Sequence, residues 1–245
     1  MQEADVPPAK ANFFDAGSPF LTHPLLTEER TARELDAIEA LLGPLTGSVL
    51  DVGCGFGRHS TALAQRGLSV VAVDPAPTMV AATKERARAA GVSIDSRCIS
   101  VTDLDSDNEF DLVLCLFTSF GQLQQASGSD APHVAAMDAM SKSLRPGGHI
   151  VLEVPDKSRL SSQLVEEEQL GPTHVTRSLD ANTAVVTEVF AVNDGPIFDL
   201  VYRIFNSDEL VSLMEQSGLV MTAVVGHGLV EPPTTMMTLV AHRPH

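Results

Sequence analysis

Three glycines within five residues form the part of this sequence best suited to chemistry. Gly53, Gly55 and Gly57 directly follow an apolar run that ends at Val52. Glycine adopts positive φ readily, and a turn without side chains lets a ligand approach the backbone closely. About twenty residues after the first glycine, a second β-branched run ends at Asp74, whose carboxylate can accept both hydrogens of a ribose diol. The segment therefore predicts a strand, turn, helix and strand that bind a nucleoside.

Arg58 decides between two kinds of cofactor. A dinucleotide fingerprint has its third glycine where this chain has Arg58, so that a pyrophosphate can sit close to the helix N-terminus. The spacing favours a nucleoside without phosphates, such as adenosine carrying a methionine-derived tail. A tight glycine turn in some other α/β sheet is the alternative. A nicotinamide-dependent oxidoreductase is disfavoured, since the chain also lacks a Tyr-x-x-x-Lys pair.

Alternating helical and strand patterns must position these residues. Residues 31–42 have apolar side chains at helical spacing, opened by a possible capping box of Thr31 and Glu34. Further helical patterns lie at 77–90, 132–144 and 207–216, and strand patterns at 69–73, 92–99, 110–116, 149–154, 219–225 and 235–241. Such alternation predicts a parallel sheet with helices on both faces. Three β-rich runs within residues 174–205, joined by short turns, predict an inserted antiparallel β lid.

Composition limits the partners that this chain can have. Its 245 residues include 32 acidic and 16 basic side chains, a net charge of −16, and are 44% hydrophobic. No Lys/Arg cluster suits a phosphate backbone, so nucleic acid is disfavoured. No apolar run reaches about eighteen residues and the first ten residues show no secretory pattern, so we expect no membrane partner and a cytoplasmic protein. Three cysteines without a C-x-x-C pair predict neither a disulfide framework nor a metal site.

Four segments, in order, resemble the class I S-adenosylmethionine-dependent methyltransferases, and in particular a subgroup that acts on small molecules. Residues 49–57 read VLDVGCGFG, against a family form V-L-D-x-G-C-G-x-G. Residues 26–42 resemble the subgroup's N-terminal helix, residues 117–121 (FTSFG) its F-x-S-F-G segment, and residues 144–148 (LRPGG) the family's turn before the fifth strand. The resemblance covers residues 24–155 well and the remainder more loosely.

The resemblance implies a doubly wound, Rossmann-like α/β fold. Its seven-stranded sheet would be mostly parallel, with an antiparallel terminal hairpin. We expect a single methyltransferase domain over residues 1–245. Residues 1–45 would form N-terminal cap helices, residues 46–155 and 206–245 the sheet core, and residues from about 170 to 205 the β lid.

The resemblance also implies S-adenosyl-L-methionine as cofactor and S-adenosyl-L-homocysteine as product. Asp51 would hold the turn or the amino group, and Asp74 the ribose hydroxyls. The implied cofactor-binding residues are Asp51, Gly53, Cys54, Gly55, Asp74, Pro75, Met79, Thr102, Asp103, Leu104, Leu116 and Phe117. The family's usual acid for the adenine amine falls on Ser100, so Asp103 and Leu104 are the best candidates in that loop, with Thr102 or Ser100 as substitutes.

The implied reaction is methyl transfer to an oxygen or nitrogen atom of a small-molecule acceptor, with natural-product biosynthesis as a setting. We expect the acceptor to contact Phe13, Phe14, Phe120, Tyr202 and His227. No catalytic residue is assigned, because alignment and water exclusion can supply most of the catalysis at an electrophilic sulfonium methyl. Tyr202 and His227 are weak candidates for a base, whereas His59 and His149 fit structural roles. The alternatives are a cyclisation or other non-methylating reaction on the same fold, and a non-catalytic binding module. A homodimer is compatible with the sequence.

Overall fold

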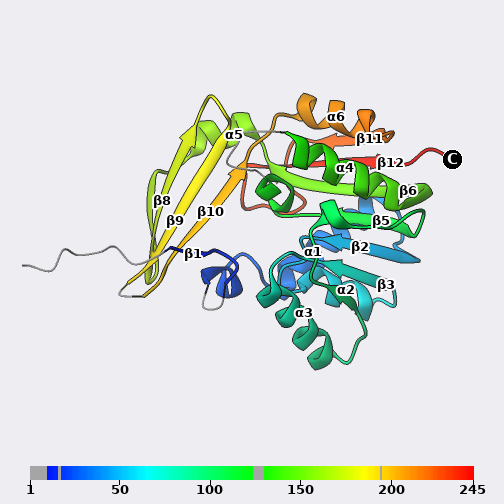
Figure 1. Cartoon of the computed structure of the whole chain (residues 1–245), viewed down its shortest axis with the longest axis horizontal. Coiled ribbons are helices and arrows are strands. Elements are labelled where there is room, and N and C mark those ends of the chain that lie inside the picture. Colours follow the sequence, from blue (N-terminus) through cyan, green and yellow to red (C-terminus); the bar gives the residue numbers. More distant parts are fainter. Residues whose placement is uncertain (1–9, 16–17, 124–129, 194) are drawn as a thin grey trace, which may run out of the picture.

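The computed structural model describes residues 10–15, 18–123, 130–193 and 195–245, which form two sheets and the helices around them (Figure 1). The larger sheet has the order β11-β12-β6-β5-β2-β3-β4. Its strands are β2 (Ser48–Val52), β3 (Ser69–Val73), β4 (Asp95–Arg97), β5 (Phe110–Cys115), β6 (Leu144–Pro155), β11 (Val220–Val225) and β12 (Met236–His242). The helices are α1 (Glu28–Leu42), α2 (Arg58–Gln65), α3 (Pro77–Ala90), α4 (Ala131–Ser143), α5 (Lys157–Gln163) and α6 (Ser207–Gln216), with short 3-10 turns η1 (Pro19–Thr22), η2 (Val101–Asp103) and η3 (Ser119–Leu123).

The pairing of the larger sheet is parallel except at β12, which runs antiparallel to both β6 and β11. The chain passes from β2 outward to β3 and β4, and later from β5 outward to β6 on the other side. The strand order therefore reverses between β2 and β5. In open α/β sheets, ligands bind at the carboxyl ends of the strands beside such a reversal. The α/β, Rossmann-like fold class predicted from the sequence is confirmed.

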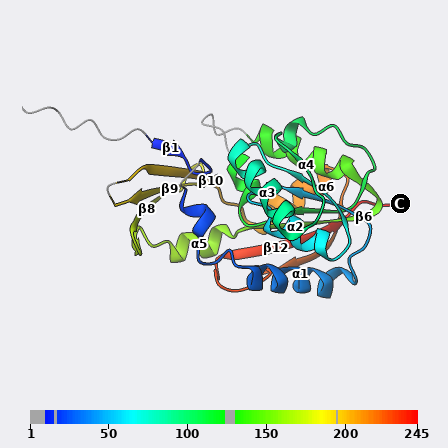
Figure 2. The same ribbon diagram turned by 90° about the horizontal axis from the view of Figure 1, so that it is seen from below.

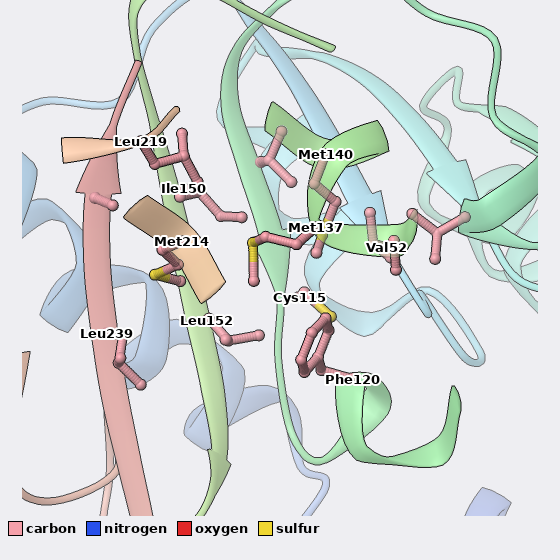
Figure 3. Packing of buried hydrophobic residues seen from close by; sticks show 14 of the residues in the cluster. Val52, Cys115, Phe120, Met137, Met140, Ile150, Leu152, Met214, Leu219 and Leu239 are labelled. Carbon is pink, nitrogen blue, oxygen red and sulfur yellow. The ribbon is translucent and has the colours of Figure 1, made fainter. Parts of the chain in front are cut away.

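Helices cover both faces of the larger sheet, with α1 on one side and α4 and α6 on the other (Figure 2). Against one face, Leu35, Ile38 and Leu63 of α1 and α2 pack on the strands. On the other, Met137 and Met140 of α4 pack beside Phe120 (Figure 3). These buried faces hold the strand ends in place, because a close-packed core resists deformation. None of the described helices has the length and apolarity that crossing a membrane requires.

The smaller sheet has the order β1-β10-β9-β8-β7. Its strands are β1 (Lys10–Asn12), β7 (Glu167–Leu170), β8 (Thr173–Asp180), β9 (Val185–Val192) and β10 (Ile197–Arg203). The sequence predicts β8, β9 and β10 but neither outer strand, because both are short and lack an alternating apolar pattern. Phe13 packs with Phe190 and Phe198 of this sheet, so the N-terminal segment is fixed to it.

Three local expectations need correction. Helix α1 begins at Glu28, where Thr27 Oγ1 accepts a hydrogen bond from the Arg30 amide at 3.1 Å, so the capping box of Thr31 and Glu34 is wrong. The strand expected at residues 92–99 is shorter, since β4 is an edge strand that pairs only with the end of β3. The turn expected at 144–148 instead begins β6, because Leu144 already pairs with Phe110.

Candidate cofactor and acceptor site

A cavity of about 380 Å³ lies at the carboxyl ends of β2, β3 and β5, beside the reversal of strand order. Its lining residues are Asn12, Phe13, Phe14, Phe20, Val52, Gly53, Gly55, Val73, Asp74, Pro75, Ile99, Ser100, Val101, Cys115, Phe117, Ser119, Phe120, Gln122, Leu123, Met140, Asp199, Leu200 and Val201. A second cavity of about 30 Å³ shares Gly53, Gly55 and Ser119 with the first and extends to Arg58 and His59. The two cavities are therefore adjacent, with the glycine turn as a shared wall.

The glycine turn is shaped by its protein neighbours as well as by space for a ligand. Gly53, Gly55 and Gly57 have φ values of 66°, 55° and 75°, which favour glycine. A Cβ at Gly53 would lie 2.6 Å from Ser119 Cβ, and one at Gly57 would lie 2.7 Å from Thr83 Cγ2. The Thr83 hydroxyl also donates to the Gly55 carbonyl at 2.8 Å. A side chain at Gly53 would therefore displace η3, and one at Gly57 would displace α3.

Asp74 presents a buried carboxylate to the main cavity. Its Oδ2 accepts a hydrogen bond from the Gly55 amide and its Oδ1 accepts one from the Ala76 amide, both at 2.9 Å. Burial raises the pKa of Asp74, and these two amide bonds oppose that rise. Each carboxylate oxygen can accept two hydrogen bonds, so both retain capacity toward the cavity. The arrangement suits a vicinal diol.

Asp51 lies at the smaller cavity and is also buried. Its Oδ2 accepts a hydrogen bond from the Ser60 hydroxyl at 2.5 Å, which ties the end of β2 to α2. A carboxylate held in this way beside Gly53 can accept a hydrogen bond from an ammonium group in the smaller cavity.

A buried cluster of charges joins α1 to the start of α2. Glu34 Oε2 accepts hydrogen bonds from Arg58 Nη1 and, at 2.8 Å, from His59 Nε2, while its Oε1 accepts from Arg30 Nε at 2.6 Å. Burial acts to raise the pKa of Glu34, but the His59 hydrogen bond and the charge of Arg58 outweigh it and lower this pKa to about 2. Burial, and then Arg58, lower the pKa of His59, while its hydrogen bond to Glu34 and the charge of that carboxylate act to raise it. Its ring is fixed by Glu34 and also lines the smaller cavity.

The Arg58 guanidinium uses one of its two terminal nitrogens for hydrogen bonds within this cluster. Its Nη1 is fixed by Glu34 and by the Thr31 hydroxyl at 3.0 Å, whereas its Nη2 is buried without a hydrogen-bond partner among the described residues. The guanidinium lies 5.7 Å from the Phe117 ring centroid and lines the smaller cavity. A buried cationic donor of this kind is suited to a carboxylate.

Glu153 of β6 is the second buried carboxyl near these arginines. Its Oε1 accepts a hydrogen bond from the Leu229 amide at 2.8 Å, and its Oε2 has no partner in the part of the chain that the structure describes. Burial raises the pKa of Glu153 to about 7, while the Leu229 amide and the charges of Arg30 and Arg58 act to lower it. Folding therefore favours the protonated form.

Glu153→Gln is expected to stabilise the protein at pH 8 by up to about 3 kcal/mol and to change its stability little at pH 5. The unfolded chain ionises this carboxyl near its ordinary pKa, whereas the folded protein ionises it only near pH 7. The stability of the wild type therefore falls as pH rises between these values. Urea unfolding of both proteins at pH 5 and pH 8 measures the effect. The same substitution at exposed Glu109 is the control, and an equal change at both pH values for Glu153→Gln would contradict this account.

Most of the residues predicted to contact ligands lie around the two cavities. The main cavity is lined by Gly53, Gly55, Asp74, Pro75, Phe117, Phe13, Phe14 and Phe120, and the smaller one by Asp51, Cys54 and Leu116 as well as by the shared glycines and Phe117. Phe117 has φ 53° and the following residue φ 76°, so the chain turns sharply as it leaves β5. That turn directs Ser119 toward Gly53, whose carbonyl accepts from the Ser119 hydroxyl at 3.2 Å.

Of the residues predicted to contact adenine, Ser100 lines the main cavity, whereas Met79, Thr102, Asp103 and Leu104 do not. Met79 is fully buried within the protein, and Leu104 packs in the core. Thr102 and Asp103 are exposed on η2. The cavity is lined instead by Ile99, Ser100 and Val101, just before these residues. The prediction followed the nearest acid, whereas the backbone turns away from the cavity after Val101.

The two candidate bases also lie outside both cavities. The Tyr202 hydroxyl donates to Glu188 Oε1 at 2.6 Å, and burial together with that carboxylate raises the pKa of Tyr202 well above its ordinary range. His227 is exposed, with Nδ1 2.7 Å from the Gly228 carbonyl oxygen. Neither side chain is placed to take a proton in the cavity. Within the described residues, no group of three or more His, Cys, Asp or Glu side chains could hold a metal ion.

Several lining residues were missed from the sequence. Phe20, Gln122, Asn12 and Asp199 come from four separate segments and meet at the main cavity, and none of them was predicted to line it. Arg58 was noted only because it replaces a glycine. Because Arg58 is the first residue of α2 and directly follows the glycine turn, the sequence could have indicated that Arg58 is buried beside these glycines.

Comparisons with known proteins agree with this geometry. The family described as "Methyltransferase domain" matches residues 49–148. Ubiquinone biosynthesis O-methyltransferase of Xanthomonas axonopodis is 30% identical over 151 residues, which cover 61% of this chain and 59% of that protein. The Nitrobacter winogradskyi protein of the same name is 32% identical over 124 residues, 49% of this chain and 41% of that one. The chain thus spans about half the length of these curated relatives.

Solved structures show the same fold. An S-adenosylmethionine-dependent methyltransferase from Clostridium acetobutylicum has a TM-score of 0.75 at 17% identity, over 93% of this chain and 96% of that one. CalS10, an amino pentose methyltransferase from Micromonospora echinaspora solved with S-adenosylmethionine bound, has a TM-score of 0.63 at 24% identity, over 88% and 91%. Residues 49–148 therefore match the methyltransferase domain family, and the chain carries the fold of the S-adenosylmethionine-dependent methyltransferases. The S-adenosyl-L-methionine cofactor that the resemblance implied is supported by the family match and by the cofactor bound in CalS10.

Proposed function

We propose that this protein transfers a methyl group from S-adenosyl-L-methionine to an oxygen or nitrogen atom of a small acceptor molecule. The observation that carries the proposal is a pair of adjacent cavities that share the glycine turn. Together they extend from Arg58 over the turn to Asp74, and on to walls formed by the N-terminal segment and β10. The main cavity, at about 380 Å³, falls within the range of about 300–1,000 Å³ that small-ligand pockets span.

The residues present fit the cofactor. Asp74 would accept the ribose hydroxyls, Asp51 the amino group and Arg58 Nη2 the carboxylate of the methionine part, while Ser100 and Val101 would flank adenine. When bound, the cofactor supplies a methyl group that its positively charged sulfur makes electrophilic. Phe117 and Phe120 would exclude water and orient the acceptor, which can account for much of the rate of such a displacement.

The smaller sheet would act as the lid over the acceptor. Its strand β10 packs closely against η3 at Gly121. A Cβ added to Gly121 would lie only 2.5 Å from the Arg203 carbonyl oxygen. CalS10 is described as taking part in calicheamicin biosynthesis, and its likeness in fold supports natural-product biosynthesis as the setting here.

The test uses S-adenosylmethionine labelled in its methyl group, incubated with the protein and pooled small amines, phenols and sugars. We expect S-adenosylhomocysteine and a labelled product in equal amounts. Cofactor that binds and is consumed without forming S-adenosylhomocysteine would favour a non-methylating reaction. Absence of S-adenosylhomocysteine binding in calorimetry would contradict the proposal.

Arg58→Met is expected to weaken S-adenosylhomocysteine binding roughly tenfold, through loss of a charge-assisted hydrogen bond. It should leave binding of 5′-deoxy-5′-methylthioadenosine unchanged, because that ligand has no carboxylate. Calorimetry with both ligands measures the difference, and Arg58→Lys, which keeps the charge, should lose less. An equal loss for both ligands would show that Arg58 acts by holding the turn rather than the carboxylate.

A further inference from the structure

The junction of the two cavities is the place where the sulfur of the cofactor must lie. In S-adenosylmethionine the sulfur links the ribose to the amino-acid part. With the ribose on Asp74 in the main cavity and the amino-acid part on Asp51 and Arg58 in the smaller one, the sulfur falls between them. The residues that line both cavities are Phe20, Gly53, Gly55, Phe117 and Ser119. Two aromatic rings, those of Phe20 and Phe117, therefore border the junction.

The Phe20 ring of η1 lies close to the glycine turn. A Cβ at Gly55 would lie 3.1 Å from Phe20 Cε1 and 3.4 Å from Phe20 Cζ. The centroid of the Phe20 ring is 5.9, 5.3 and 5.6 Å from those of Phe13, Phe14 and Phe56. These three neighbouring rings hold Phe20 beside the turn, where it borders any ligand that crosses from one cavity to the other.

The Phe117 ring already lies near two cations. The guanidinium groups of Arg30 and Arg58 are each 5.7 Å from its centroid. Like charges repel, so a third cation at this ring is disfavoured. Across the described residues, the contacts of guanidinium groups with aromatic rings involve Phe117, Phe56 and Phe205, and Phe20 takes part in none of them. Of the two rings at the junction, Phe20 is therefore the one that can receive a cationic ligand.

An aromatic ring attracts a cation within about 6 Å of its centroid, and binding of onium ligands is a known use of this interaction. We propose that the Phe20 ring contacts the positively charged sulfur of S-adenosylmethionine and thereby favours this cofactor over its uncharged product, S-adenosylhomocysteine. This inference rests on the proposed function and adds a residue that determines which form of the cofactor is bound. When the methyl group leaves, the electron pair of the broken carbon–sulfur bond stays on the sulfur and cancels its charge. The interaction with Phe20 is then lost, which favours exchange of product for cofactor.

The test compares three ligands on the full chain by calorimetry, without an acceptor. They are S-adenosylmethionine, S-adenosylhomocysteine and sinefungin, in which a carbon bearing an ammonium group replaces the methylsulfonium. We expect Phe20→Leu to weaken binding of S-adenosylmethionine about fivefold more than binding of S-adenosylhomocysteine, because leucine keeps the apolar bulk but lacks the ring. Sinefungin should follow S-adenosylmethionine, since it is also a cation at this position. This third ligand separates the effect of charge from that of the methyl group.

Two further variants serve as controls. Phe20→Tyr keeps an aromatic ring and should keep the wild-type ratio of the affinities for S-adenosylmethionine and S-adenosylhomocysteine. Phe190→Leu removes a buried ring that packs against Phe13 at a centroid distance of 4.6 Å but lines neither cavity. It should leave the ratio unchanged.

The outcomes distinguish this inference from the function on which it rests. If the wild type binds neither S-adenosylmethionine nor S-adenosylhomocysteine, the proposed function itself is contradicted. If the wild type binds both and Phe20→Leu weakens both equally, binds neither or changes neither, the role of Phe20 in recognising the charge is overturned while the proposed function stands. A change in the ratio that sinefungin does not follow also overturns it, because the methyl group and not the charge would then be what Phe20 contacts.

Discussion

Replacing Glu34 by alanine is expected to lower the free energy of unfolding by about 3–5 kcal/mol. Removing one partner of a buried ion pair leaves the other charge uncompensated, and here two guanidinium groups lose the same carboxylate. Glu34 is fully buried, so water cannot replace it without rearrangement. Urea unfolding at pH 7 measures the change.

The expected loss is large because the cluster joins segments that are distant in the sequence. Arg30 Nη2 donates to the Val230 carbonyl at 2.8 Å, and Arg30 also bonds to the Pro232 carbonyl. Arg58 starts α2 directly after the glycine turn. Without Glu34, α1 loses its ties to the turn, and S-adenosylhomocysteine affinity should fall together with stability.

Two variants calibrate this prediction. Glu39→Ala removes an acid of the same helix that pairs with Arg66 at the surface, where an ion pair contributes at most about 1 kcal/mol. Glu34→Gln keeps the shape and some of the hydrogen bonds, so it should be less destabilising than Glu34→Ala. If Glu34→Ala costs no more than Glu39→Ala, the cluster does not stabilise the fold as described.

The part of the fold around the glycine turn could be predicted because its signals are local. The glycine turn, the apolar strands beside it and Asp74 at the next strand end lie within a short stretch of chain, and each has a distinct pattern. The positive φ values of the glycines and the position of Asp74 follow from that pattern.

The charge cluster could not be predicted, because its members are joined by packing rather than by sequence. Glu34 and Arg58 belong to different helices, and the distance between them gives no periodic signal. The local pattern around Thr31 favoured a capping box, which is a common use of such an acid. The structure uses Thr27 for that purpose and leaves Glu34 free to face α2.

The wall of the main cavity that β1 and β10 form depends on long-range pairing in the same way. β1 is three residues long and owes its place to pairing with β10, so nothing near Asn12 indicated that it would face Asp199. Asp103, predicted for the adenine loop, lies outside the main cavity for a different reason. A family position was filled with the nearest acid, Asp103, although the chain has already left the cavity at that point.

Asp74→Ala is expected to weaken S-adenosylhomocysteine binding by more than tenfold, from the loss of charge-assisted hydrogen bonds to the ribose diol worth ~1.5–3 kcal/mol. Calorimetry measures the affinity. Asp103→Ala is the matched control, since Asp103 is an exposed acid that lies outside both cavities and should leave the affinity unchanged. A loss at Asp103 with none at Asp74 would reverse the assignment.

A loss of affinity at Asp74 has two possible causes, because this carboxylate also accepts the amides of Gly55 and Ala76. A ligand that lacks one ribose hydroxyl separates them. The wild type should bind the 2′-deoxy derivative of S-adenosylhomocysteine less tightly than the parent, whereas Asp74→Ala should bind both equally, since the group that distinguishes them has been removed. If the variant weakens both ligands but keeps the wild-type ratio between them, Asp74 holds the glycine turn and the diol is recognised elsewhere. The ratio of the affinities for these two ligands, measured for the wild type and for Asp74→Ala, therefore shows whether the carboxylate contacts the sugar or only the backbone of the glycine turn.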